Sequence, residues 1–190
     1  MLRIKSLGFG LILINVLALS GCIPCPPPPI TVDAYFTWPG SNDSTDEPKQ
    51  QIISHIDTAA KSIDAAVYVV SDPDIGRHLA EATHRNVTVR IVMDNNYIGQ
   101  CYALANTPDS RGITFRKNKV GKEMHDKFAI FDGNSIITGS YNWSESADKD
   151  NFENIVVTND FEVVRKYEDV FNRLWTDDYT EAYSTRAICP

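Results

Sequence analysis

The sequence is short of positive charge and of cysteine. It has 18 lysine and arginine residues against 25 aspartate and glutamate residues, for a net charge of −7. Such an acidic chain is a poor general binder of polyanions, which argues against DNA binding over a broad surface but not against a local basic site. Among the four cysteines, no C-x2-C pair has a second cluster of metal ligands beside it, which disfavours a zinc site. No segment repeats, so the 190 residues are expected to form one domain.

A long hydrophobic run is missing as well. The apolar stretch Leu7–Leu19 is short for a transmembrane helix, and Arg3 and Lys5 give it a positive amino-terminal flank. It ends in the sequence LSGC at Cys22, which resembles a bacterial lipobox. We therefore expect residues 1–21 to be a lipoprotein signal peptide and Cys22 to be lipidated. The alternatives are an ordinary secretory signal with an incidental cysteine, and a retained anchor helix.

Export and a membrane anchor follow from this interpretation. Residues 22–31 are rich in proline and predict a stiff tether. Ile23, rather than an aspartate, follows the lipidated residue, as in lipoproteins sorted to the periplasmic face of the outer membrane. If Cys22 is lipidated, Cys25, Cys101 and Cys189 remain, and one pair can form a disulfide. The pair Cys101–Cys189 is favoured because Cys25 sits in the tether.

The hydrophobic pattern predicts an α/β fold with a mixed, mainly parallel sheet flanked by helices on both faces. The catalytic domain is expected to span residues 32–178, with a fraying tail at 179–190. Strands are expected at 32–37, 65–70, 87–93, 112–116 (an edge strand), 128–131 and 135–138. Helices are expected from Pro48, after the cap at 71–74, around 102–105 and over 161–175.

The segment from Met124 to Val157 carries the chemistry. It reads as strand, tight turn, strand, polar loop and strand, with Gly133 and Asn134 as the turn. Polar residues stand where these strands begin and end, so they can converge on one small volume.

These residues resemble the phospholipase D superfamily signature H-x-K-x4-D-x6-G-S-x-N. The six fixed positions are filled by His125, Lys127, Asp132, Gly139, Ser140 and Asn142. Six matches at this spacing arise by chance on the order of one time in a million. Glu153 follows as in the family's small bacterial nucleases. The resemblance implies a phosphodiesterase that needs neither a metal nor another cofactor.

A phosphodiester resists attack because its charge repels nucleophiles. Lys127 offers a fixed positive charge, and Ser140 and Asn142 offer neutral hydrogen-bond donors. Gly139 lets the backbone approach a ligand closely. Together these residues are expected to hold the phosphoryl group.

His125 can attack phosphorus when its ring is neutral and form a phosphohistidine. Glu153 is the best candidate to accept a hydrogen bond from its other ring nitrogen, and Asp132 is expected to orient Lys127 or the turn. A second imidazole must protonate the leaving oxygen. Because family members with one motif pair two chains, the resemblance implies a homodimer with its twofold axis through the active site.

The only basic concentration leads into this motif, at Arg111, Arg116, Lys117, Lys119, Lys122 and Lys127. It is either a guide for a phosphodiester backbone or a solvated loop. Tyr141 and Trp143 can stack on a base or belong to the core. The favoured function is a nuclease acting on DNA or RNA. The alternatives are a lipid phosphodiesterase of the phospholipase D or cardiolipin type and a non-catalytic, membrane-tethered binding module.

Overall fold

A computed structural model describes residues 28–40, 48–119 and 121–185 of the chain. The expected signal peptide, Cys22 and most of the tether lie outside these residues. So do Cys25 and Cys189.

Alternating strands and helices follow the apolar periodicity of the sequence. The strands are β1 (Val32–Phe36), β2 (Ser62–Val67), β3 (Thr88–Met93), β4 (Ile113–Asn118), β5 (Lys127–Phe131), β6 (Ser135–Gly139), β7 (Asn154–Thr158) and β8 (Thr180–Tyr183). The α-helices are α1 (Pro48–Thr58), α2 (Pro73–His84), α3 (Asn95–Ile98), α4 (Glu145–Lys149) and α5 (Phe161–Leu174). Two 3-10 turns, η1 (Leu104–Asn106) and η2 (Pro108–Ser110), occupy the segment where one short helix was expected.

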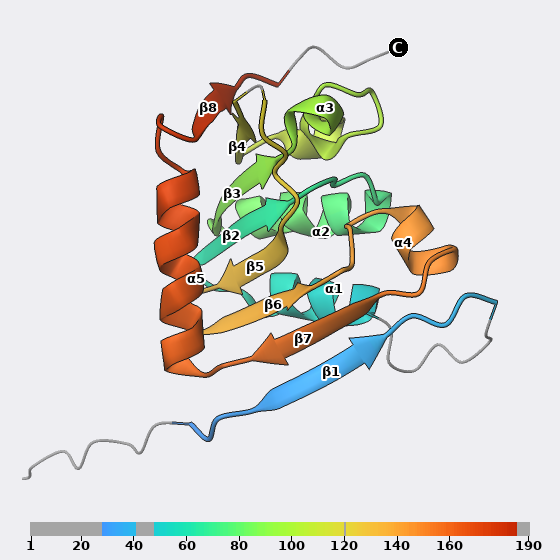
Figure 1. The fold of residues 1–190 in the computed structure, drawn as a ribbon, viewed down its shortest axis with the longest axis vertical. Coiled ribbons are helices and arrows are strands. Elements are labelled where there is room, and N and C mark those ends of the chain that lie inside the picture. The colour runs from blue at the N-terminus through green and yellow to red at the C-terminus, as the bar shows by residue number, and fades with distance from the viewer. Residues whose placement is uncertain (1–27, 41–47, 120, 186–190) are drawn as a thin grey trace, which may run out of the picture.

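The strands form one sheet in the order β1-β7-β6-β5-β2-β3-β4-β8. Helices α1 and α2 lie behind it in Figure 1, and α5 runs across the strands at the left. The prediction of a mixed α/β sheet with helices on both faces is confirmed, but "mainly parallel" is wrong. Only β2–β3 and β3–β4 are parallel, and the other neighbours are antiparallel. The short turn at Gly133 and Asn134 can only return the chain antiparallel, and β7 continues that meander.

Two apolar layers sandwich the sheet. The larger packs α1 and α2 onto one face, with Ile52, Ile56 and Leu79 fully buried. The smaller packs α5 onto the other face through Val164 and Phe171. Asp160 caps α5 by accepting hydrogen bonds from the amides of Glu162 and Val163. This rigid sandwich fixes the strand ends that carry the motif.

Strand β4 is not an edge strand, because β8 pairs with it antiparallel from Phe115↔Tyr183 to Asn118↔Thr180. The segment from 179 onward therefore contributes a strand to the sheet rather than fraying at once. Apolar pattern alone misses it because TEAY is mostly polar, and two of its four residues are exposed.

The last tether residues are joined to the domain. Asn159 accepts a hydrogen bond from the Thr31 amide and donates one to the Pro29 carbonyl. Cys101 is disulfide-bonded. The partner expected from the sequence, Cys189, lies outside the described residues. Across residues 28–40, 48–119 and 121–185, no helix is long and apolar enough to cross a membrane.

Candidate active site

The motif residues meet at one edge of the sheet because β5, β6 and β7 are antiparallel neighbours. His125 and Lys127 stand where β5 begins, Gly139 and Ser140 where β6 ends, and Glu153 immediately before β7. Antiparallel order places the start of β5, the end of β6 and the start of β7 together. In Figure 1 this edge lies at the right, beside α3 and α4.

His125 is exposed and held against Tyr68, with ring centroids 4.7 Å apart. Lys127 Nζ lies 3.2 Å from His125 Nδ1 and also donates to the His125 carbonyl at 2.7 Å. The same ammonium lies 4.9 Å from the centre of the Tyr68 ring. Since an ammonium can only donate, Nδ1 is the acceptor in this contact.

Burial lowers the pKa of Lys127 below its ordinary value, although the charges of Glu153 and Asp126 oppose the shift. The lysine remains a cation near neutral pH but is less strongly hydrated than a free one. Tyr68 differs, because a hydrogen bond to Tyr97, together with burial and nearby charge, raises its pKa to about 12. The phenol therefore stays neutral beside His125 and Lys127.

Glu153 pairs with Ser140 in this structure. The Ser140 hydroxyl donates a hydrogen bond to Glu153 Oε2, and Asn151 Nδ2 donates to Oε1 at 3.2 Å. The Glu153 amide donates to the Thr37 hydroxyl at 2.7 Å, which ties the start of β7 to the end of β1. The expected hydrogen bond between His125 and Glu153 is not formed between these two described side chains.

Gly139 is required by the neighbouring strand. A Cβ at this position would lie 2.1 Å from the Asn154 carbonyl oxygen and 2.8 Å from the Ile155 Cα. The close approach lets the Ser140 amide donate to the Asn154 carbonyl at 3.0 Å. Nearby, Asn142 Oδ1 is buried with no hydrogen-bond partner among the described residues, so the amide retains unused bonding capacity at the site.

Asp132 lies at the opposite edge of the sheet from Lys127, about 17 Å away along five residues of strand. Its carboxylate accepts hydrogen bonds from the amides of Ala60, Lys61 and Ser62, where α1 turns into β2. Burial would raise the pKa of Asp132, but these amides together lower it. Of the two roles expected for Asp132, it therefore supports a turn and does not orient Lys127.

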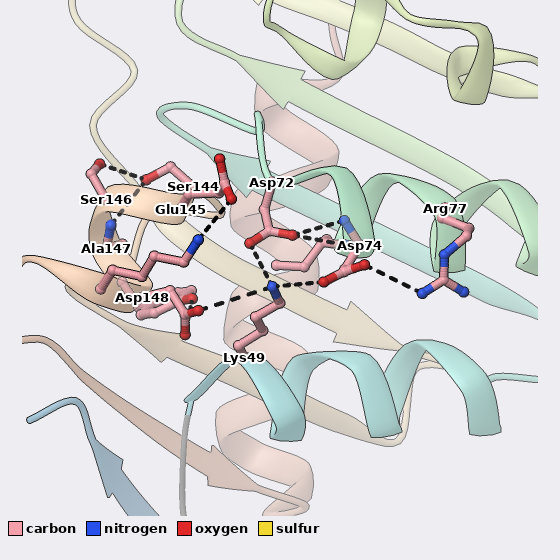
Figure 2. A network of polar contacts seen from close by, with 12 residues as sticks. Lys49, Asp72, Asp74, Arg77, Ser144, Glu145, Ser146, Ala147 and Asp148 are labelled. Carbon is pink, nitrogen blue, oxygen red and sulfur yellow. Dashed lines mark hydrogen bonds and ion pairs between the residues drawn. The ribbon is translucent and has the colours of Figure 1, made fainter. Parts of the chain in front are cut away.

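An ion-pair cluster centred on Lys49 fixes the loop that follows β6 (Figure 2). Lys49 Nζ lies 3.0 Å from both Asp72 and Asp74 and 4.0 Å from Asp148. It thereby joins the first turns of α1 and α2 to α4. The Trp143 carbonyl accepts hydrogen bonds from the amides of residues 71 and 72. The loop bearing Ser140 and Asn142 is thus held at its carboxyl-terminal flank.

Two residues of the basic segment from Arg111 to Lys127 form ion pairs away from the motif. Arg116 forms an ion pair with Asp177, and Lys117 forms one with Glu181 at 3.1 Å. Both contacts hold the β8 segment against β4. Among the lysines expected to guide a substrate, Lys122 is exposed and has no ion-pair partner among the described residues.

The aromatic residues beside the motif are buried. Tyr141 and Trp143 are 1% and 2% exposed, so they belong to the core rather than to a stacking surface. Instead, Trp38 and Phe152 are exposed and pack edge to face, with centroids 6.1 Å apart, next to Glu153. Sequence reasoning missed these two residues and also Tyr68. The signal for Tyr68 was its position directly after a buried strand.

One group of side chains in the described part of the chain is close enough to share a metal ion. It consists of Asp57, His78 and Glu81 on α1 and α2, and none of them belongs to the motif. His78 Nδ1 already contacts Asp57 at 2.6 Å.

Known proteins are similar to this chain in sequence and in fold. The family described as "Cardiolipin synthase, PLD-like domain" matches residues 52–175, which is more than half of the chain. The chain belongs to the phospholipase D superfamily. The mitochondrial cardiolipin hydrolase of Xenopus laevis is 33% identical over 133 residues, covering 70% of this chain and 63% of the relative. That of Xenopus tropicalis is 31% identical over 156 residues, covering 80% and 74%. The phospholipase D of Rickettsia bellii is 35% identical over 116 residues, covering 61% and 58%. The chain thus spans only part of the length of these curated relatives, from 58% to 74%.

Solved structures of the superfamily share the fold. Nuc from Salmonella typhimurium, a phospholipase D family member, superposes with a TM-score of 0.71 at 26% identity and covers 82% of this chain and 99% of its own. NucT from Helicobacter pylori superposes with a TM-score of 0.68 at 19% identity, which supports the fold alone.

Proposed function

We propose that this protein is a phosphodiesterase that hydrolyses nucleic acid through a phosphohistidine at His125. The observation that carries the proposal is the meeting of the His125 imidazole, the half-buried Lys127 ammonium and the Ser140 hydroxyl at one exposed edge of the sheet. The intact set also argues against a binding module without catalysis.

In the proposed reaction, Lys127 turns from His125 toward the non-bridging oxygens, where Ser140 and Asn142 add neutral hydrogen-bond donors. A ring nitrogen of His125 forms a bond to phosphorus, the bond from phosphorus to the leaving oxygen breaks, and a second imidazole protonates that oxygen. Water then attacks phosphorus and gives its proton to the second imidazole. The P–N bond breaks, which releases a phosphomonoester and restores His125.

The second imidazole must come from another chain. The remaining histidines are His55, His78 and His84, all on α1 or α2. The ring of His55 packs against Phe131, at the opposite end of β5 from Lys127, and His78 contacts Asp57. We therefore propose a homodimer in which His125 of each subunit faces its counterpart across a twofold axis.

Nucleic acid is the favoured substrate because the site lies open on the surface. His125 and Ser140 are exposed, so a long polymer can lie across the edge of the sheet.

A phospholipid is the second candidate. The exposed pair Trp38 and Phe152 next to Glu153 could enter a bilayer interface, where aromatic side chains are favoured. Several curated relatives are named cardiolipin hydrolases or phospholipase D. Lipidation of Cys22 and residence on the periplasmic face of the outer membrane remain part of the proposal, and they would place the site near a membrane surface.

The test uses the full chain, purified in detergent and diluted below the critical micelle concentration, with plasmid and cardiolipin vesicles as separate substrates and excess EDTA in each. Plasmid nicking supports the proposal, conversion of cardiolipin to phosphatidate and phosphatidylglycerol alone supports the second candidate, and silence on both removes the enzyme assignment. His125→Ala should lower turnover at least about 1000-fold. The matched control is His84→Ala, because His84 is exposed on α2, away from the motif. Loss of activity in EDTA, or full activity of a strict monomer, would contradict the mechanism.

A further inference from the structure

A cavity of about 380 Å³ opens beside the catalytic pair, between the ends of β5 and β6 and helix α5. His125 and Lys127 line one side, Thr138 lies in its wall, and Lys166 and Tyr167 line it from α5. Its size is that of a pocket for a small ligand group. The cavity is therefore lined both by motif residues and by residues of α5, a helix that lies outside the motif.

The charge on Lys166 is available to a ligand. Lys166 is exposed and has no ion-pair partner among the described residues. Its neighbour Arg165 differs, lying 3.6 Å from Glu162 and 3.7 Å from Asp169 on the same helix. Helix α5 thus neutralises Arg165 locally and presents Lys166 to the cavity.

The rest of the wall suits an anion that also accepts hydrogen bonds. The Tyr167 hydroxyl donates to the Thr138 hydroxyl at 3.2 Å, which holds two neutral polar groups at the wall. The negatively charged Asp126 also lines the cavity. It would repel an anionic ligand, so binding such a ligand requires the positive charge of Lys166 to offset that repulsion.

We propose that this cavity binds the phosphate next to the scissile one on a nucleic acid strand, with Lys166 as its cation. The inference rests on the proposed function and extends it, because it makes the substrate a polymer of phosphodiesters rather than a molecule with one phosphate. Lys166 is then a specificity-determining residue that improves binding without touching the reacting phosphorus.

The experiment compares Lys166→Met with Arg165→Met, which removes the same charge from the adjacent position. Each is assayed on bis(p-nitrophenyl) phosphate, which has one phosphate, and on a single-stranded 12-nucleotide DNA. Lys166→Met should raise KM for the DNA about three- to fivefold with kcat unchanged. It should also reduce the slope of log affinity against log salt by about 0.7. The small substrate should be hydrolysed as by the unmodified protein, and Arg165→Met should change neither reaction.

Equal effects of the two variants on the DNA would overturn the inference, as would an equal effect of Lys166→Met on both substrates. A Lys166→Met effect on cardiolipin vesicles but not on DNA would also overturn it, assigning the second phosphate to a lipid. If the unmodified protein hydrolyses no phosphodiester, the proposed function fails, yet the cavity can still be tested. Labelled DNA would then be titrated against His125→Ala with and without Lys166→Met, and a loss of affinity below twofold would remove the subsite.

Discussion

Replacing Gly139 with alanine should damage the active site through the backbone of the adjacent strand. The added Cβ would lie 2.1 Å from the Asn154 carbonyl oxygen, so β6 and β7 would have to separate by about 1.3 Å to restore ordinary contact. The obstacle is backbone, and β7 is held on its other side by five residue pairs with β1. Relief by a rotamer change is therefore impossible.

We expect Gly139→Ala to lower the free energy of unfolding by about 2–4 kcal/mol, at the upper end of overpacking costs. The separation would also stretch the bond from the Ser140 amide to the Asn154 carbonyl and shift Glu153, so turnover should fall by at least about tenfold. Urea unfolding at fixed protein concentration, followed by tryptophan fluorescence, gives the first quantity. Hydrolysis of bis(p-nitrophenyl) phosphate gives the second.

Gly99→Ala is the matched control. A Cβ there meets nothing within 4 Å, and the backbone conformation suits any residue, so the change should stay within about 0.5 kcal/mol. If Gly139→Ala matched Gly99→Ala in both stability and turnover, the reasoning from strand contact would be refuted.

Three further predictions concern charge. Asp132→Asn should cost about 1–3 kcal/mol of stability at neutral pH without changing the turnover of folded protein. Because the folded-state pKa of Asp132 is lowered, its stabilisation is lost as pH falls through that pKa, so urea midpoints of variant and unmodified protein should converge in acid and not elsewhere. Lys49→Met should cost about 3–5 kcal/mol, since it leaves the buried Asp72 unpaired, and a calorimetric change below 1 kcal/mol would contradict the cluster. Hydrogen bonds to Asp72 and Asp74 outweigh burial and raise the pKa of Lys49, so this contribution should persist to alkaline pH and fade only as pH rises through the raised value. Burial lowers the pKa of Lys127, so an NMR titration of its side chain should give a pKa below the ordinary lysine value, and an ordinary or raised pKa would contradict the effect of burial.

The sequence by itself indicated that His125, Lys127, Gly139 and Ser140 lie at one edge of the sheet. The spacing from His125 to Asn142 contains a strand, a three-residue turn and a returning strand, all of which form from local contacts. Apolar periodicity likewise located α1, α2 and α5 within a few residues, since each helix must bury one face. The family resemblance drew on the same short segment.

Only the tertiary structure decided the partners of the charged groups. Asp132 meets the amides of residues 60–62, about 70 positions away, and Arg116 meets Asp177 across 61 positions. Glu153 accepts a hydrogen bond from Ser140 rather than from His125. Lys166, on α5, lines the same cavity as His125 and Lys127. Such pairings depend on how strands distant in sequence are ordered in the sheet, and a polar side chain carries no periodic signal that reveals its partner.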